Sequence, residues 1–241
     1  MKTGGKVALY KFQAANFNAL TALKKHSLYF SSLDKFNDAT ETMFGLLPSE
    51  TPVSGDCVPD VKKLKQCSVL CMATDGKDRV VEENLLMWTH YGDQLSGICL
   101  VFNEPLLKQS FTQSGCTLHQ KVTYGYPKLI SEDQLVGEHM GIERVAGIDF
   151  LSINKNRLMR SFIFNKPKCF DYESEYRFVL NSAGLIEYSP ESLEKIIFGS
   201  KIHSMELKDI FIEVAKKVNP NIDIYEARVE ENSFKITVEK C

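Results

Sequence analysis

Strand-like and helix-like apolar patterns alternate along the whole of this 241-residue chain, and no linker separates them. Apolar residues recur with a period of two in some segments and at i, i+3 spacing in others. This mixture, without any internal repeat, predicts a single α+β domain over residues 1–241, with mixed or antiparallel sheets and flanking helices. We expect strands at 7–12, 28–31, 67–73, 97–102, 117–126, 172–180, 194–198, 222–229 and 234–238, and helices at 17–25, 82–91, 142–164 and 205–218.

One segment departs from this alternation. Residues 44–60 contain Pro48, Pro52 and Pro59 together with two glycines. Proline and glycine interrupt both regular structures. We therefore expect 44–60 to be a mobile surface loop.

Composition narrows the class of protein. The formal net charge is only −2 and 44% of the residues are hydrophobic, which excludes a disordered chain and argues against coating nucleic acid by bulk charge. No apolar run approaches the roughly 18 residues of a membrane span, and the first residues lack the apolar core of a signal peptide. We therefore expect a cytoplasmic protein without membrane contact.

Seven cysteines, an odd number without a secretory signal, predict free thiols in a reducing compartment. Cys67 and Cys71 lie inside an expected buried strand. No second close pair and no paired histidines complete a zinc site. We therefore expect no metal.

The most informative stretch is residues 172–180, which reads as an alternating strand. Side chains of a strand point alternately to its two faces. One face would carry the mostly aromatic and apolar set Tyr172, Ser174, Tyr176, Phe178 and Leu180. The other would carry Glu173, Glu175 and Arg177, which can bind and polarise a polar ligand. We expect this charged face to line the main pocket, the alternative being a solvated face whose charges are merely tolerated.

A second cluster, residues 85–92, contains the only tryptophan of the chain. We expect Trp88 to be buried and His90 to reach the same pocket from the helix end, because Met87 and His90 form an i, i+3 pair. Tyr91 is a further candidate contact. The alternative is a histidine that is hydrogen-bonded in the core and binds nothing.

A third cluster follows the expected strand at 28–31. Asn37, Asp38 and Glu41 either build a turn through side-chain to backbone hydrogen bonds or place an amide or carboxylate on a ligand hydroxyl. The chain contains no phosphate-binding G-x-x-x-x-G-K-[ST], no G-x-G-x-x-G after a strand, no H-E-x-x-H and no G-x-S-x-G. The common nucleotide-loop, zinc-protease and serine-hydrolase classes are therefore not indicated.

Taken together, these stretches resemble a bacterial and phage family of unknown function, the domain numbered 2971. The matching residues are Leu9–Phe12, Leu28–Ser32, Phe36–Asp38, Glu41, Met87–Gly92, Gly97–Cys99, Lys166, Lys168, Tyr172–Arg177 and Lys195–Gly199. The family usually reads Asn-Asp-Pro where this chain has Asn37-Asp38-Ala39. The resemblance implies no established activity.

The order of three motifs is also similar to ADP-ribosyltransferase-like folds: Tyr10-Lys11, then residues 29–32, then Glu173-Ser174-Glu175. This resemblance implies that NAD is the substrate and a protein or nucleic acid the acceptor. By match, Glu175 would be the catalytic carboxylate and Glu173 its partner for the acceptor. The residues implied to bind NAD are Lys11, Tyr10, Ser31, Asn37, His90, Tyr91 and Arg177. Lys11 replaces the usual arginine or histidine and would act as a point charge on phosphate.

Two other classes of function stay open. The first is a non-catalytic module whose polar pocket binds a nucleotide or a protein. The second is a metal-dependent nuclease, which would use Asp38, Glu41, Lys168, Glu173 and Glu175 around an ion. Release of nicotinamide from NAD distinguishes an enzyme that consumes NAD from the binding module and from the nuclease.

Overall fold

In the computed structural model, the described residues are 7–36, 46–47, 67–76, 79–116, 118–125, 130–131, 140–145, 148–153, 160 and 162–241. Side chains are described in these ranges except at 46–47, 130–131, 140–145 and 148–153. Within this part of the chain, strands and helices follow one another in the mixed order that the sequence predicts.

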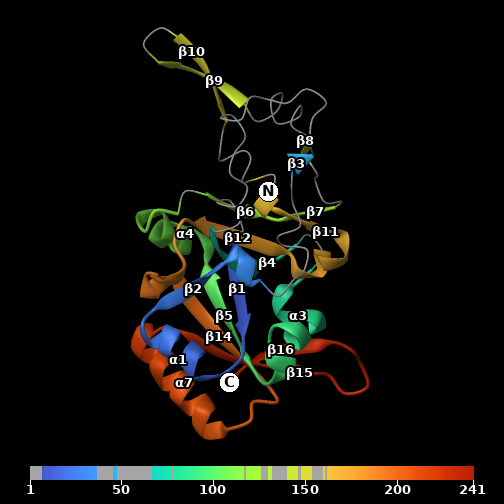
Figure 1. The fold of residues 1–241 in the computed structure, drawn as a ribbon. Helices are drawn as coiled ribbons and strands as arrows, with labels where there is room; N and C mark the ends of the chain where they lie inside the picture. The colour runs from blue at the N-terminus through green and yellow to red at the C-terminus, as the bar shows by residue number, and fades with distance from the viewer. Residues whose placement is uncertain are drawn as a thin grey trace, which may run out of the picture.

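A ten-stranded mixed sheet organises the molecule (Figure 1). The strand order is β13-β2-β4-β1-β5-β14-β15-β16, and β12 pairs with β4 and β6. Its strands are β1 (Ala8–Gln13), β2 (Ser27–Ser32), β4 (Ser68–Thr74), β5 (Ile98–Asn103), β6 (Leu118–Lys121), β12 (Glu175–Leu180), β13 (Gly184–Glu187), β14 (Leu193–Gly199), β15 (Asp223–Val229) and β16 (Ile236–Lys240). The β14–β15 pair is parallel and the other pairs of this sheet are antiparallel.

Three smaller pairings complete the strands. They are β3 (Leu46–Leu47) with β8 (Ile130–Ser131), β7 (Thr123–Gly125) with β11 (Asn165–Pro167), and β9 (Met140–Val145) with β10 (Ile148–Ile153). The β7–β11 pair matters for the site, because it holds Lys166 beside the start of β12.

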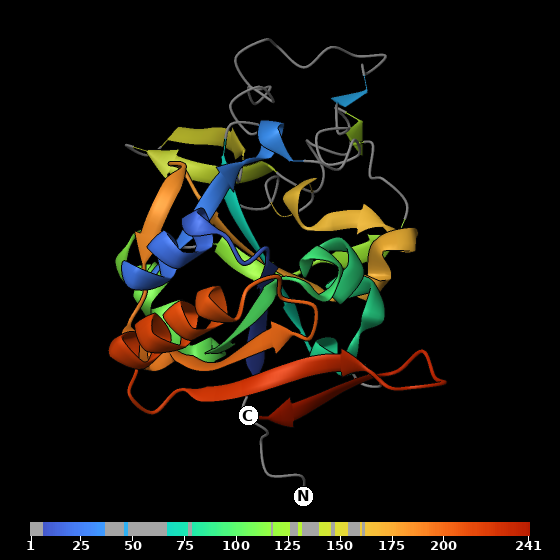
Figure 2. The ribbon, with the colours of Figure 1, turned by 90° about the horizontal axis from the view of Figure 1, so that it is seen from below.

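The helices are α1 (Phe17–Lys24), α3 (Leu85–His90), α4 (Glu104–Gln113) and α7 (Met205–Val218). Each begins at an Asn or Ser whose side chain accepts a hydrogen bond from a backbone N–H of the first turn: Asn16, Asn84, Asn103 and Ser204. Figures 1 and 2 show α1 and α7 side by side on one face of the sheet, with α3 on the opposite side.

Strand β5 shows why the sheet is covered on both faces. All six of its residues are buried. Ile98, Leu100 and Phe102 belong to the core cluster that includes residues of α1, α4 and α7, whereas Cys99 and Val101 belong to the cluster around Trp88 of α3. The period of two therefore divides one apolar run between two cores. The predicted α+β class with a mixed sheet and flanking helices is confirmed.

One predicted element is wrong. Residues 142–164 were expected to be a long helix, but β9 and β10 pair as an antiparallel hairpin, with Val145 opposite Ile148. The part of the segment that forms the hairpin contains the β-branched residues Ile142, Val145 and Ile148, and Gly147 lies between its two strands, which favours strands and a turn over a continuous helix. Helix α4 was not anticipated, although Asn103 and Pro105 are a typical helix start.

Two predicted elements are shorter than expected. The predicted helix 82–91 is a 3-10 turn (Val81–Glu83) followed by α3, which Asn84 caps. The predicted strand 172–180 begins only at Glu175. Lys168–Glu173 form a 3-10 segment, and Ser174 has a left-handed backbone with φ of 45°.

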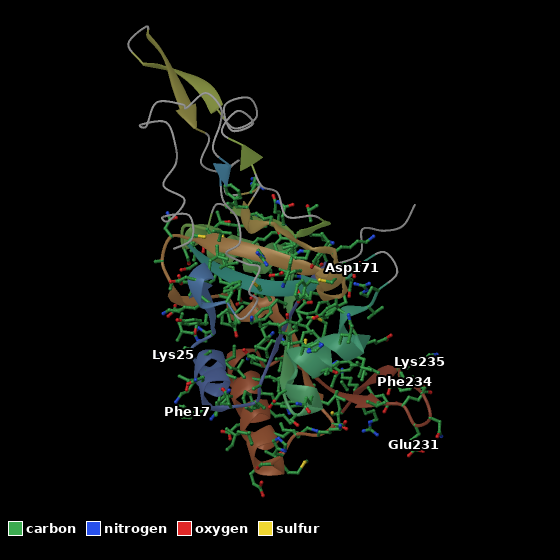
Figure 3. All side chains as sticks on the ribbon, turned by 45° about the vertical axis from the view of Figure 1, so that its right-hand side comes forward. Phe17, Lys25, Asp171, Glu231, Phe234 and Lys235 are labelled. Atoms are coloured by element: carbon green, nitrogen blue, oxygen red, sulfur yellow. The ribbon has the colours of Figure 1, made fainter. Side chains whose placement is uncertain are left out.

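The surface carries a few isolated apolar side chains. Phe17 at the start of α1 and Phe234 in the β15–β16 connection point outward (Figure 3). None of the helices in the described ranges is long and apolar enough to cross a membrane. The predicted loop 44–60 lies outside the described residues except for the strand residues Leu46–Leu47. The described cysteines are free thiols, as expected, and Cys57 lies outside the described residues.

Candidate functional site

A cavity of about 330 Å³ lies where β1, β4, α3, β11 and the start of β12 meet. Its apolar wall includes Phe12, Phe36, Met72 and Met87. Its polar wall is formed by Tyr10, Lys11, Ser31, Lys35, Tyr91, Lys166, Glu173 and Glu175. Two carboxylates and several cations from distant parts of the sequence therefore line one cavity, whose size and composition are typical of ligand sites.

Glu175 is fixed by its neighbour on the same face of β12. Arg177 donates from Nε to Glu175 Oε1 at 2.7 Å and from Nη2 to Oε2 at 2.9 Å, which is bidentate pairing. Arg177 is fully buried, whereas Glu175 reaches the cavity with 5% of its surface exposed. The alternative of a solvated face is therefore excluded: Glu175 lines the cavity, as predicted, but Arg177 does not and instead supports Glu175.

Glu173 reaches the same cavity from the 3-10 segment before β12. Tyr91 Oη donates to its Oε1 at 2.6 Å, and Lys166 Nζ donates to its Oε2 at 2.7 Å. Lys166 Nζ also lies 3.7 Å from Glu175 Oε2. Lys166 therefore bridges the two carboxylates.

The pKa values of the two carboxyl groups move in opposite directions. Burial raises the pKa of Glu173, and the hydrogen bonds from Lys166 and Tyr91 offset this only in part. Burial acts on Glu175 as well, but the charge and hydrogen bonds of Arg177, with Lys166, outweigh it and hold its pKa below the usual range. When two neighbouring carboxyl groups have pKa values shifted in opposite directions, the group with the lowered pKa stays ionised and the group with the raised pKa can exchange a proton.

Lys11 and Tyr10 lie on the β1 wall. Lys11 Nζ donates to the Cys71 carbonyl at 3.0 Å, and burial lowers its pKa. Tyr10 Oη donates to Asp75 Oδ2 at 2.9 Å. Burial and this carboxylate raise the pKa of Tyr10, so its hydroxyl stays protonated. Lys11 is thus held in the cavity wall by a backbone carbonyl.

A second hollow of about 690 Å³ adjoins the cavity. It runs between α1 and the β2–β13 pair and includes Asn18, Tyr29 and Leu185. Both spaces are lined by Lys11, Phe12, Ser31, Phe36 and Cys71. These five residues therefore lie between the two spaces or at their shared border.

Most of the site residues expected from the sequence meet here. Tyr10, Lys11, Ser31, Tyr91, Glu173 and Glu175 line the cavity, and Arg177 supports Glu175. Asn37, with Asp38 and Glu41, lies outside the described residues.

The expectation for His90 is wrong. Trp88 is buried as predicted, but His90 is exposed and lies against Tyr172, with ring centroids 6.0 Å apart, outside the cavity lining. At about 100° per residue, Tyr91 is about 40° from Met87 around the helix axis and His90 about 60° on the other side. Tyr91, not His90, follows the direction of Met87 into the cavity.

Sequence reasoning missed Lys166 as a site residue. Its position in β11 depends on parallel pairing with β7, which no local pattern indicates. It likewise missed Tyr124, whose hydroxyl accepts a hydrogen bond of 2.7 Å from the Glu175 backbone N–H. The described residues contain no group of three or more His, Cys, Asp or Glu suited to a metal ion.

An unusual turn sets the position of Tyr91. The three residues after Gly92, namely Asp93, Gln94 and Leu95, all have positive φ, between 50° and 71°. A Cβ on Gly92 would lie 2.6 Å from Trp88 Cε3, and one on Gly199 would lie 2.1 Å from the Leu95 carbonyl oxygen. Close backbone packing therefore anchors the end of α3 to β14.

One family model matches the central part of the chain. Residues 87–178 match the model of DUF2971, described as a protein of unknown function. This confirms the predicted family resemblance over α3, β5 and most of β12. No curated protein and no solved structure matches the chain.

Proposed function

We propose that the protein consumes NAD, breaking the bond between nicotinamide and ribose and passing the ADP-ribosyl group to water or to a protein or nucleic-acid acceptor. The observation that carries this proposal is the meeting of Glu173 and Glu175 with Lys11 and Lys166 around one cavity. The order of these motifs along the chain, similar to ADP-ribosyltransferase-like folds, adds support.

Glu175 is the group suited to the reacting ribose. Departure of nicotinamide leaves positive charge on C1′ and the ring oxygen. A carboxylate that stays ionised in an enclosed site stabilises this charge without reorganising. Arg177 keeps Glu175 ionised and in one orientation.

Glu173 is suited to the acceptor. Its raised pKa makes it a better proton acceptor than an ordinary carboxylate. In this role it removes the proton from the water or hydroxyl that attacks C1′. Ser31 shapes the wall beside the nicotinamide, and Lys11 lies at the junction where the phosphates of a dinucleotide would pass.

The test is release of nicotinamide from NAD by the purified protein. Glu175→Gln preserves size but removes the charge, and we expect turnover to fall by about 10²–10³. Glu213→Gln is the matched control, because Glu213 is an exposed carboxylate paired with Lys217 on α7. No release from the wild-type protein, or full activity in Glu175→Gln at matched thermal stability, contradicts the proposal.

A second candidate function is a binding module without catalysis. It is favoured by one observation: both oxygens of Glu175 are engaged by Arg177, so the carboxylate is already paired before any ligand enters. Calorimetry with NAD measures binding, and the nicotinamide assay measures cleavage. A binding module gives the first signal and not the second, whereas the enzyme gives both.

A further inference from the structure

Tyr91 lines the cavity and contacts a buried carboxylate. Its hydroxyl bonds to Glu173, of which only 3% is exposed, while Tyr91 itself is 41% exposed. The Tyr91 hydroxyl therefore contacts the shielded carboxylate and belongs to a residue that is itself partly exposed. A hydroxyl group can both donate and accept a hydrogen bond.

We propose that Tyr91 is the proton relay of the site, carrying the proton that Glu173 takes from the acceptor out to solvent. The inference rests on the proposed function and deepens it. As the C1′–N bond breaks, nicotinamide leaves with the electron pair, and the acceptor oxygen bonds to C1′. The acceptor proton passes to Glu173 and then to Tyr91 Oη, whose own proton passes to water.

The other groups that contact Glu173 are less suited than Tyr91 to accept its proton. Lys166 holds Oε2, but an ammonium group has no lone pair and cannot accept a proton. The remaining titratable groups facing Glu173 are Glu175, Tyr172 and Tyr124. Tyr172 also interacts with Tyr91, so it lies beside the same route and does not replace it. Glu175 is held ionised by Arg177, and the Tyr124 hydroxyl is engaged by the Glu175 backbone N–H.

The backbone keeps the relay in position. Tyr91 is the C-cap residue of α3, and its backbone N–H donates to the Met87 carbonyl at 2.9 Å. Gly92 donates to the same carbonyl at 3.0 Å, and Gly97 donates to Gly92 at 2.9 Å. A proton path needs a donor and an acceptor held within hydrogen-bond distance, and this turn provides the fixed end.

The experiment compares Tyr91→Phe, which removes only the hydroxyl, with Tyr188→Phe. Tyr188 is a buried tyrosine in the main core cluster, and its hydroxyl has no hydrogen-bond partner among the described residues. We expect Tyr91→Phe to lower turnover of NAD at neutral pH by about 10²-fold or more and Tyr188→Phe to leave it unchanged.

Two readouts separate a relay from a merely structural role. Loss of the hydrogen bond removes a stabiliser of the Glu173 carboxylate, so the acid limb of the pH–rate profile moves to higher pH in Tyr91→Phe. Imidazole, a small buffer that can replace the hydroxyl, should raise the rate of Tyr91→Phe with concentration and leave the wild-type rate flat. An unmoved acid limb, or no rescue by imidazole, overturns the relay.

Failure of the proposed function is recognised separately. If the wild-type protein releases no nicotinamide, the ¹³C carboxyl resonance of Glu173 is titrated in wild type and in both variants. A midpoint that rises in Tyr91→Phe alone supports the contact on which the relay depends. A midpoint that is the same in all three overturns the relay along with the NAD reaction.

Discussion

One ion pair of the cavity and one near the C-terminus have nearly the same length and different surroundings. Lys166 Nζ lies 2.7 Å from Glu173 Oε2, and Lys240 Nζ lies 2.6 Å from Asp223 Oδ1. The side chains of the first pair are 6% and 4% exposed, and those of the second are 61% and 49% exposed. Water screens the second pair but not the first.

The comparison shows that burial, rather than distance, decides what a pair does. In the cavity each charge has lost its hydration, so removing one partner leaves the other without compensation. At the surface, water replaces a lost partner. The cavity network is therefore a fixed arrangement of charge, whereas each surface pair can be lost with little effect on stability.

The largest expected effect is that of Arg177→Met. This change leaves Glu175 buried without its guanidinium, and we expect the free energy of unfolding to fall by about 3–5 kcal/mol. Urea unfolding followed by circular dichroism measures it. The double variant Glu175→Leu/Arg177→Met removes both charges and should recover most of the loss. If the double variant is no more stable than Arg177→Met, the charge explanation is wrong.

The next effect is on acid stability. The pKa of Glu175 is lowered in the folded protein, so its contribution to stability is complete above the unfolded value of about 4.3 and is lost as pH falls through the folded pKa. The slope of stability against pH below about pH 4 should therefore be shallower in the Glu175→Leu/Arg177→Met variant. Unfolding curves at several acidic pH values test this, and parallel slopes in the two proteins would contradict it.

Lys11→Ala should weaken binding of NAD by about tenfold, because a lysine that meets phosphate makes a charged hydrogen bond worth about 1.5–3 kcal/mol, part of which water replaces. Its effect on binding of nicotinamide alone should be absent. Calorimetry with the two ligands measures both. If Lys11→Ala weakens the binding of nicotinamide as much as that of NAD, Lys11 does not contact the phosphates.

The smallest expected effect is that of Lys240→Ala. The exposed pair with Asp223 contributes about 0.2–1 kcal/mol, and we expect a loss of stability within that range. The loss should shrink further in 0.5 M salt. A loss comparable to that of Arg177→Met would remove the distinction between the two regions.

The sequence predicted the parts of the site that follow local periodicity. Alternation in β12 put Glu175 and Arg177 on one face, and a helix end at residues 90–91 was expected near the pocket. Ser174 interrupts the strand through its left-handed backbone, which no propensity indicates for serine. Glu173 nevertheless reaches the cavity, because the 3-10 segment directs it there.

What the sequence could not predict depends on long-range pairing. Lys166 enters the site through β11 and β7, which lie about 40 residues apart. The first part of the helix predicted at 142–164 is a hairpin, because the apolar residues there fit both periods and pairing of β9 with β10 decides between them. The i, i+3 spacing from Met87 predicts His90 at the pocket, but Tyr91, at i+4, lies closer to the direction of Met87 around the helix and lines the cavity instead.

The charges of β12 also have a consequence for how the strand assembles. Tyr176 and Phe178 face the main core, and Arg177 lies between them on the other face, opposite Cys71 of β4. A slip of β12 by one residue would turn Arg177 and Glu175 into the main core, among Phe30, Phe111 and their neighbours. It would also turn Tyr176 and Phe178 to the face that carries the charged groups. Such a misaligned chain would lose several kcal/mol for each buried charge. The ionic groups of the cavity thus act during folding as a check on alignment, admitting a single register of the central sheet.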